Sequence, residues 1–360
     1  MITKKRLYII GLLLIVLIDS CKHSNREQNY LIKNDIINFE ARDIKASELL
    51  GSNIRYIQLD SIGANKIGRV NKIVKRNQNF YILSDDKRIF QFDTMGRFIS
   101  LLNKPGKGPE EYSRIEDFDI YMINGKPQLW LSDFSKIKIY EYNINWELDT
   151  IITFPYVVNK FKRLKNGNIL LMTGQNEKTL TLVDAKGEVV KTFLEKQIPF
   201  LTLKSVQFIA NDSLILFPLG VANEYVSFNQ KTEEFGYGNF IKTNDLISKN
   251  ELLELYEQKG FDFYGDLKEK IYLNNIRFLK EKIIVQFNKR GERYIAVVVN
   301  KDEEVLSSRF MPNSTIIDDI TPQNNSKYFK SFLYGDSDNS LIFLQNPESS
   351  NDGIAIIDIS

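Results

Sequence analysis

The sequence has one cysteine, Cys21, and one histidine, His23. A single cysteine cannot form an intramolecular disulfide, so a body of this size has to be held together by its core. His23 stands in the tail beside Cys21, which excludes a Ser-His-Asp triad in the rest of the chain. The two side chains most often used for nucleophilic and metal chemistry are therefore missing from the body of the protein.

A surplus of charge of one sign is also missing. The 360 residues carry a formal net charge of +2, and the first 20 residues account for that surplus themselves. Nucleic-acid binding needs a concentrated basic surface, so we expect no nucleic-acid partner. The remaining composition, 43% hydrophobic and 26% charged, is ordinary for a globular domain.

The N-terminus has the layout of an export signal. A basic stretch at 3–6 precedes an apolar run at 7–18, which is too short to span a bilayer. A small residue, Ser20, then stands directly before Cys21. This arrangement resembles a bacterial lipobox, and the resemblance implies cleavage before Cys21 and attachment of lipid to it. The alternative is a short membrane anchor with an incidental cysteine.

Short β-rich runs alternate with turn residues from residue 69 onward. The unit at 69–103 contains four such runs, and the apolar and polar residues alternate as in half-buried strands. Each unit is too small to bury its own faces, so neighbours have to stack, as the blades of a β-propeller do. Further copies of the unit occupy 128–143, 168–193, 213–230, 282–310 and 340–360.

The last copy ends after its third strand. An additional strand at 54–59 precedes the first copy, and we expect it to complete the last blade and close the ring. The predicted fold is all-β: a six-bladed propeller of four-stranded antiparallel blades over 51–360. Residues 1–20 are predicted to be a signal peptide and 21–50 a lipidated tether, with a short helix near 46–50.

The spacing between the fourth and fifth copies leaves room for a helical insert at 241–271. Ser248 suits an N-cap, Glu251 suits the capping-box position, and Gly260 suits the position just after the helix. We expect a short helix there. Its buried face is predicted to carry Leu252, Leu255 and Tyr256.

The stretch 54–155 carries a family resemblance, above all in the run Gly-Lys-Gly-Pro-Glu-Glu-Tyr at 106–112. The chain resembles a family of six-bladed β-propeller lipoproteins that is abundant in gut Bacteroidetes and related in architecture to NHL-repeat propellers. The resemblance implies a fold and a place at the cell envelope. It implies no reaction.

The loop at 105–112 is a candidate binding site. Glycine and proline fix its conformation, and Lys107, Glu110 and Tyr112 are available for polar contacts. The spacing is not that of a P-loop. The alternative interpretation is a structural crossover between two blades in which Tyr112 packs against a neighbour.

The insert offers a second candidate in Phe261, Asp262 and Tyr264. Aromatic rings beside an acidic hydrogen-bond acceptor suit sugar or peptide recognition. The alternative is that these aromatic side chains pin the insert to the rim of the propeller.

Several carboxylates stand close together in the sequence: Asp85 and Asp86, Asp117 and Asp119, Asp318 and Asp319. Such pairs occur in glycosidases and in Ca²⁺ sites. Turn and surface aspartates are commoner, and no loop here has the alternating pattern of a calcium loop. We therefore predict no catalytic residue, no metal site and no cofactor.

The sequence favours a non-catalytic binding propeller at the cell envelope, with a glycan, a peptide or an envelope protein as its partner. The alternative is a carboxylate-based lyase or hydrolase acting on a glycan. A third possibility is an assembly protein that uses the insert as its contact. We expect a monomer, lipid-anchored in the outer membrane and facing the periplasm.

Overall fold

The computed structural model describes most of the chain between Tyr30 and Ile359. The described residues are 30–33, 43–51, 53–60, 67–173, 178–195, 208–210, 213–279, 282–299, 304–309, 315–322, 327–329, 332–334, 336–337, 341–345 and 355–359. The predicted signal peptide and Cys21 lie outside these residues.

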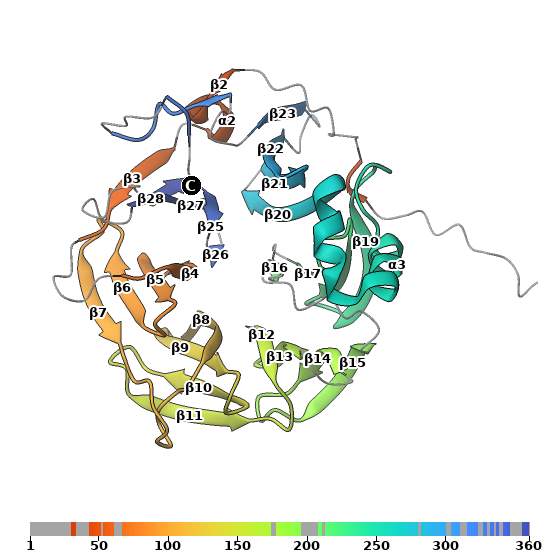
Figure 1. Ribbon diagram of the computed structural model, residues 1–360. Coiled ribbons are helices and arrows are strands. Elements are labelled where there is room, and N and C mark those ends of the chain that lie inside the picture. Colours follow the sequence, from red (N-terminus) through yellow and green to blue (C-terminus); the bar gives the residue numbers. More distant parts are fainter. Residues whose placement is uncertain are drawn as a thin grey trace, which may run out of the picture.

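The strands form a ring of antiparallel sheets around a central axis (Figure 1). Five blades are each built from four consecutive strands, with the first strand nearest the axis and the fourth on the outside (Figure 1). In chain order the strands are β4 (Val70–Arg76), β5 (Asn79–Ser84), β6 (Ile89–Asp93) and β7 (Phe98–Leu102); β8 (Ile115–Ile123), β9 (Lys126–Asp133), β10 (Lys138–Tyr142) and β11 (Leu148–Thr153); β12 (Val158–Arg163), β13 (Ile169–Thr173), β14 (Lys178–Val183) and β15 (Val189–Glu195); β16 (Ile209–Ala210), β17 (Leu214–Pro218), β18 (Glu224–Asn229) and β19 (Glu234–Ile241); β20 (Ile271–Leu279), β21 (Lys282–Lys289), β22 (Glu292–Val299) and β23 (Glu304–Arg309).

A composite sheet takes its strands from both ends of the chain. It has the order β25 (Phe332–Tyr334), β27 (Leu341–Gln345), β28 (Ala355–Ile359) and β3 (Ile54–Gln58). β3 pairs antiparallel with β28, so the N-terminal segment supplies the outer strand, as its sequence predicts. The prediction of six equivalent blades is thus corrected to five continuous blades and one composite sheet.

The composite sheet is joined to the first blade by polar and steric contacts. Asp358 on β28 is fully buried and accepts hydrogen bonds from Lys75 of β4 at 2.8 Å and from Arg55 of β3 at 2.6 Å. The turn of the first blade also sits against β3. A Cβ atom on Gly96 would lie 2.1 Å from the Gln58 carbonyl oxygen, and its φ of +84° favours glycine as well.

Three further short strands extend the sheets. β1 (Tyr30–Ile32) pairs parallel with the outer strand β19, β2 (Ile44–Lys45) pairs parallel with β24 (Ile316–Ile317), and β26 (Asp336–Ser337) pairs parallel with the inner strand β4. The predicted helix near 46–50 is confirmed as α2 (Ala46–Leu50).

The segment before β3 is packed rather than loose. Ala46, Leu49 and Leu50 are buried in a core cluster with Ile284 and Ile357. Residues 43–50 therefore belong to the folded body, which corrects the predicted tether boundary at residue 50. The physical reason is the apolar face of α2, which has to be removed from water.

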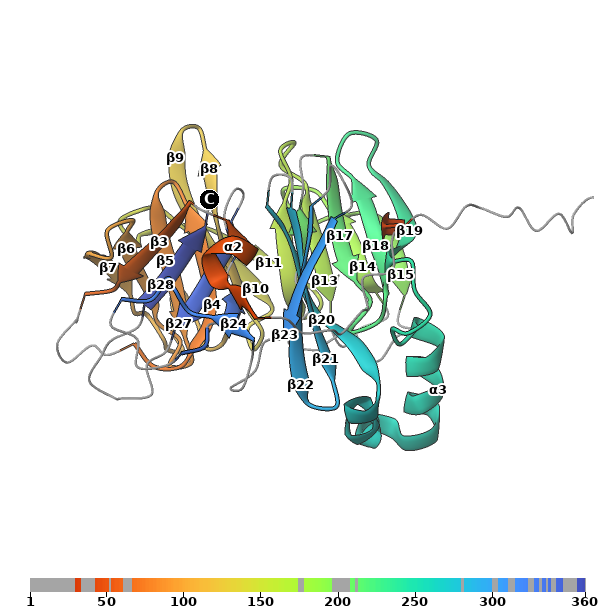
Figure 2. The same cartoon turned by 90° about the horizontal axis from the view of Figure 1, so that it is seen from above.

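The predicted helical insert is confirmed. α3 (Lys249–Lys259) begins after Ser248 in a complete capping box with Glu251, and Gly260 follows it at a φ of 58°. Leu252 is fully buried, and a 3₁₀ helix, η2 (Gly260–Glu269), continues the insert to β20. Figure 2 shows the insert projecting at one end of the ring, opposite the turn between β8 and β9.

The core lies between neighbouring sheets. Each apolar cluster draws its side chains from two adjacent sheets of the ring, as expected where strands alternate between two faces. Tyr81 and Leu83 of the first blade, for example, pack with Phe118 and Leu131 of the second. Some polar side chains are buried among these apolar ones, and several of them lie on the inner strands.

Candidate functional site

Three neighbouring inner strands carry charged side chains at alternate positions. Side chains two or four residues apart on a strand point to the same side, so each strand presents its charges together. We call this set the charged wall. It consists of Lys72 and Arg76 on β4, Asp117 and Asp119 on β8, and Lys160 and Lys162 on β12.

The first tier of the charged wall is centred on Asp117. The Lys72 ammonium donates to Asp117 Oδ1 at 2.7 Å and to the Phe118 carbonyl oxygen at 2.7 Å. Lys160 Nζ lies 3.8 Å from the same carboxylate oxygen and 3.4 Å from the Glu116 carbonyl oxygen. The Phe161 backbone N–H donates to Asp117 Oδ2 at 3.3 Å. One buried carboxylate thus binds groups from the blades on both sides of it.

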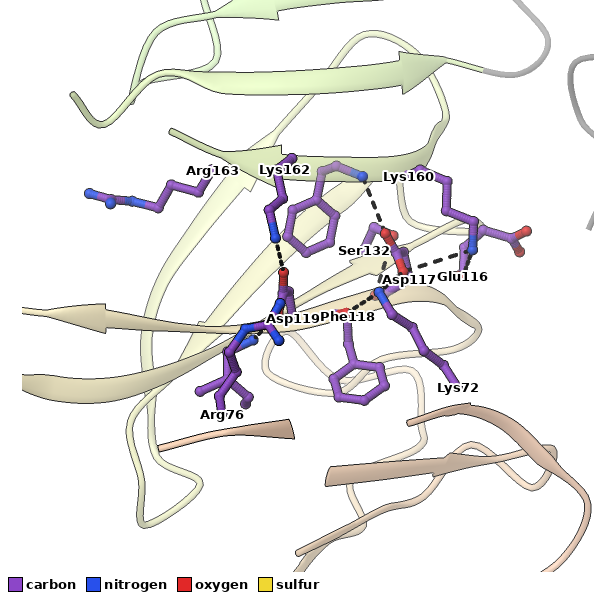
Figure 3. Close-up of polar contacts among 12 residues, drawn as sticks. Lys72, Arg76, Glu116, Asp117, Phe118, Asp119, Ser132, Lys160, Lys162 and Arg163 are labelled. Atoms are coloured by element: carbon purple, nitrogen blue, oxygen red, sulfur yellow. Dashed lines mark hydrogen bonds and ion pairs between the residues drawn. The ribbon is translucent and has the colours of Figure 1, made fainter. Parts of the chain in front are cut away.

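The second tier repeats this arrangement around Asp119. Lys162 Nζ donates to Asp119 Oδ2 at 3.0 Å, and Arg76 Nη2 lies 3.4 Å from Asp119 Oδ1. The Ile120 backbone N–H donates to Asp119 Oδ1 at 2.8 Å. Figure 3 shows the two tiers side by side, with cations from β4 on one side and from β12 on the other.

The charged wall borders a shallow hollow of about 10 Å³, which has room for about one water molecule and opens to solvent. Its lining includes Lys72, Lys160 and Lys162 together with the rings of Phe161 and Phe208. The two aspartate side chains are almost fully buried, whereas the lysine side chains keep exposures of 11%, 17% and 15%. Solvent therefore reaches the cations more than the carboxylates.

Within the wall itself, four cationic side chains face two carboxylates. Arg76 and Lys162 also have interactions outside the wall. The oxygen atoms of Asp117 and Asp119 are occupied by cationic side chains and backbone N–H groups. This differs from the open arrangement of a glycosidase acid–base pair or of Ca²⁺ ligands.

The other paired aspartates have roles in turns. Asp86 is held by Arg88 and Ser84, and these hydrogen bonds lower the pKa of its carboxyl against a desolvation effect that raises it. Asp318 accepts from the Ile320 and Thr321 backbone N–H groups, at 3.1 and 3.0 Å. These contacts explain the carboxylates without a metal or a reaction.

Two ionisable side chains of the second blade have a pKa raised by burial. Burial raises the pKa of the Tyr121 phenol well above its usual value, and the nearby Asp119 charge raises it further. Tyr121 accepts from the Arg163 backbone N–H at 2.9 Å. Burial also raises the pKa of the Glu141 carboxyl to about 7, although the Arg163 charge lowers it. Tyr121 stays protonated at neutral pH, which excludes it as a base.

A second shallow hollow, of about 10 Å³, lies at the inner strand β20. Its polar lining is Asn274, Asn275 and Arg277, at a bulge where β20 shifts register against β21. Arg277 donates to the Ile276 carbonyl oxygen at 2.8 Å. We call this the amide-lined hollow. It contains one cation and no carboxylate among its described lining residues.

The predicted candidate loop at 105–112 is held in place by hydrogen bonds among residues of the loop and its flanks. Tyr112 is fully buried and its hydroxyl accepts from the Lys104 backbone N–H at 3.1 Å, while the Glu111 carboxylate accepts from the Gly108 backbone N–H at 2.7 Å. Lys107 and Glu110 have exposed side chains. The loop thus has the contacts of a structural crossover between the first and second blades.

The second blade fastens the same loop from the outside. Tyr142 donates to the Glu110 carbonyl oxygen at 3.0 Å and Tyr140 donates to that of Glu111 at 3.1 Å. Lys136 donates to the Gly108 carbonyl oxygen at 2.8 Å. Burial raises the pKa of Tyr140 to about 12, so its phenol is a permanent donor at neutral pH.

The insert candidates are divided between core and surface. Phe263 is fully buried in the core of the third and fourth blades, whereas Phe261 is 59% exposed and Asp262 is exposed. Tyr256 packs edge-on against both phenylalanine rings, at 5.3 and 6.3 Å. The side chain of Tyr264 lies outside the described part of the structure. Among the described contacts, none joins this group to the 105–112 loop.

The charged wall was not predicted as a site. Asp117 and Asp119 were considered only as a carboxylate pair, and the lysines opposite them were not considered. The available signal was the repeated spacing of like charges, two or four residues apart, in strands expected to be innermost. Alternation alone does not distinguish a solvated strand face from a face turned toward the channel.

A ring of antiparallel sheets with charged inner strands defines the class of this protein: it is a β-propeller. The chain belongs to the family described as a domain of unknown function, DUF4934, which matches residues 33–352. No curated protein matches the sequence. Among the described residues, no helix is both long and apolar enough to cross a membrane.

Two crystal structures of Bacteroides proteins share the fold. A protein from Bacteroides fragilis NCTC 9343, described as exported, has a TM-score of 0.72 and 15% identity and covers 91% of this chain and 98% of its own. A member of the DUF4221 family from Bacteroides vulgatus ATCC 8482 has a TM-score of 0.51 and 12% identity, covering 84% of this chain and 95% of its own. At these identities the likeness concerns the fold.

Proposed function

We propose that this protein is a non-catalytic binding propeller of the cell envelope that holds its ligand at the charged wall. One observation carries the proposal: four cations surround two carboxylates that are already ion-paired, beside a hollow that solvent reaches. Lys160, whose printed contacts are 3.4 Å and 3.8 Å long, is the cation of the wall best placed to bind a ligand. In this proposal the composite sheet completes the ring as a sixth blade.

The same geometry weighs against catalysis by the wall. General acid–base chemistry needs a group whose pKa is poised near the working pH and which can reach the reacting atom. Asp117 and Asp119 each bind two cationic side chains and a backbone N–H, so their oxygen atoms are engaged. The proposal therefore assigns the wall to recognition.

A ligand screen with a turnover readout tests this function. The melting temperature of the purified protein is measured in the presence of oligosaccharides, peptides and envelope extracts. A ligand that binds only the folded state raises this temperature. Each stabilising compound is then incubated overnight with the protein and recovered, and its molecular mass is determined by mass spectrometry. We expect unchanged ligand. Cleaved or unsaturated glycan products would instead establish the alternative, a carboxylate-based lyase or hydrolase.

The proposed location at the cell envelope rests on the N-terminal sequence rather than on the fold. We propose that Cys21 is lipidated and that the mature protein is anchored to the outer membrane, facing the periplasm. The structural neighbour from Bacteroides fragilis that is described as exported supports export in this fold group. Cell fractionation tests the anchor. Cys21→Ser is expected to move the protein from the membrane fraction to the soluble fraction, and an unchanged membrane fraction would contradict lipidation.

A further inference from the structure

We propose that the lipid-anchored protein rests on the bilayer with the rim of its fourth blade, so that the outer strand β19 faces the phospholipid headgroups and the ring stands edge-on to the membrane. This inference rests on the proposed lipidation of Cys21 and adds the surface that the membrane contacts. It follows from three features: the point where the N-terminal segment is fastened, the length of chain between that point and Cys21, and the side chains exposed around it.

The N-terminal segment is fastened to the rim of the fourth blade. β1 pairs parallel with β19, with Ile32 opposite Ile241. Ile32 is buried in the core between the fourth and fifth blades, and its carbonyl oxygen accepts from the Lys242 backbone N–H at 2.9 Å. Figures 1 and 2 both show β1, in red, on the outside of the ring beside β19. The N-terminal segment therefore joins the folded body at the side of the ring and not at either end of its axis.

The chain between Cys21 and this rim is short. Tyr30 follows Cys21 by nine residues, which span about 30 Å when fully extended and about 17 Å on average as a flexible linker. A compact chain of this length has a radius of gyration of about 20 Å and hence a diameter of about 50 Å. With the opposite rim, at β7, on the bilayer, Tyr30 would lie farther from the membrane than the chain reaches (Figure 1). The anchor therefore keeps the β19 side of the ring near the bilayer.

The side chains exposed around β19 suit the headgroup layer. Tyr237 of β19 is largely exposed, and its ring lies 5.3 Å from that of Phe193 on the neighbouring outer strand β15. Phe193 in turn stacks on Phe235 at 4.5 Å, and Val190 of β15 is exposed as well. A tyrosine presents an apolar ring together with a polar hydroxyl, which is typical of residues at a membrane–water interface. The aromatic contacts beside Tyr237 hold its ring at this surface.

Charge contributes little to the fit. Charged residues on β19 and within three residues of its ends are two of each sign: Lys231, Glu233, Glu234 and Lys242. Lys191 on β15 adds one positive charge, and its ammonium lies 5.7 Å from the centre of the Phe235 ring. A lysine can cover an apolar surface with its stem while its ammonium reaches polar groups. We therefore expect the contact to form on zwitterionic lipid as well as on anionic lipid.

Two other orientations are within reach of the anchor, with the ring lying flat on either of its ends. The insert end exposes Phe261, but residues 249–269 contain six acidic residues and three lysines, and an anionic membrane surface repels such a segment. The opposite end exposes Met122 at the β8–β9 turn, beside the exposed polar residues Asn124 and Lys126 (Figure 2). Neither end groups aromatic side chains as β15 and β19 do. Edge-on placement leaves both ends of the ring clear of the bilayer.

Site-specific fluorescence quenching tests the orientation. The lipid occupies the sulfur of Cys21 and the chain has no other cysteine, so a dye can be attached to one introduced cysteine at a time. Four positions of similar exposure (57%, 59%, 50% and 48%) mark the β19 rim, the insert end, the turn end and the opposite rim: Tyr237→Cys, Phe261→Cys, Met122→Cys and Ile99→Cys. Each lipidated variant is reconstituted into vesicles that contain phosphatidylcholine spin-labelled in the headgroup.

We expect the strongest quenching of the dye at position 237 and none at position 99. The same labels in a Cys21→Ser background should not be quenched, because that protein is not anchored. Stronger quenching at position 261 or 122 would place the ring flat on that end, and stronger quenching at position 99 would place the opposite rim on the bilayer. Each of these three results would overturn the inference.

A second measurement distinguishes contact from mere proximity. With the dye at Val190→Cys, the additional substitution Tyr237→Asp should reduce the quenching about twofold or more, because a carboxylate resists removal from water at the lipid surface. Met95→Asp, at an exposed position in the first blade, is the matched control and should leave the quenching unchanged. Melting curves show whether each variant is folded. Unchanged quenching in a folded Tyr237→Asp variant would show that β19 does not form the contact.

Flotation of the vesicles separates a failure of this inference from a failure of the anchor. If the labelled protein floats with the vesicles but another position is quenched most, the orientation is wrong and lipidation stands. If protein with an intact Cys21 does not float, the anchor and the orientation both fail, whereas the binding function proposed for the charged wall is unaffected.

Discussion

Two parts of the channel lining differ in how they use polar residues. The charged wall on β4, β8 and β12 contains six ionisable side chains, tied into two tiers by ion pairs between blades. The amide-lined hollow at β20 contains two asparagines and one arginine, on a strand with a bulge. The first is a connected network that links three blades, and the second is a local group on one strand.

The difference follows from the cost of burying charge. An ionised side chain can be buried only if partners replace its water, so each member of the wall requires another. Neutral amides carry a smaller desolvation penalty and can stand singly. The wall therefore ties the packing of neighbouring blades together, whereas the amide-lined hollow is a group on a single inner strand.

Removing the centre of one tier should have the largest effect. Asp117→Ala leaves Lys72 without its carboxylate partner in a buried site, and breaking a buried pair in this way costs about 3–5 kcal/mol of unfolding free energy. Urea unfolding at pH 7 measures the loss. Glu116→Gln is the matched control on the same strand, since its pair with Arg114 is largely exposed and should be worth at most about 1 kcal/mol. Equal losses in the two variants would show that the tier is not a coupled network.

The features of the fold that could be predicted were mostly those set by residues close together in the sequence. The capping box at Ser248 and the alternation of β5 and β6 are local patterns, and both led to the right element. The pairing of β3 with β28 joins residues about 300 apart, and it was predictable only because one copy lacked a strand. The argument was that the blades have to stack in a closed ring, so the incomplete last copy needs a strand from elsewhere in the chain.

The charged wall depended on relations that no local pattern contains. Lys72, Asp117 and Lys160 lie more than 40 residues from one another in sequence, and their contacts arise only when three blades stack. The 105–112 loop attracted attention because glycine and proline are conspicuous in a sequence. In the structure its hydrogen bonds are made within the loop, to Tyr112 and Glu111, and by side chains of the second blade.

An intermediate effect on stability is expected at Glu141, which is in the second blade and outside the charged wall. Its folded-state pKa of about 7 lies above the ordinary 4.5, so between these pH values the folded protein keeps a proton that the unfolded chain releases. Stability contributed by this group should therefore be fully present below pH 4.5 and be lost as the pH rises to 7. With allowance for solvent screening, the loss is about 1–2 kcal/mol.

Glu141→Gln tests this by removing the titration. The variant should be more stable than the wild type at pH 8 and nearly equal to it at pH 4.5, as measured by urea midpoints across that range. Thr150→Ser, which changes the residue paired with Glu141 across the strands without changing charge, should keep the wild-type pH profile. A Glu141→Gln profile parallel to that of the wild type would show that the carboxyl does not titrate in this window.

The smallest effect is expected in the amide-lined hollow, and it tests whether the two parts of the channel are independent. Asn275→Ala removes one amide from the lining while the backbone pairing of β20 with β21 remains, so the change in unfolding free energy should stay within about 1 kcal/mol. If Asn275→Ala lost as much unfolding free energy as Asp117→Ala, the amide-lined hollow would have to be part of one coupled network with the charged wall, and the contrast between the two parts of the lining would be wrong.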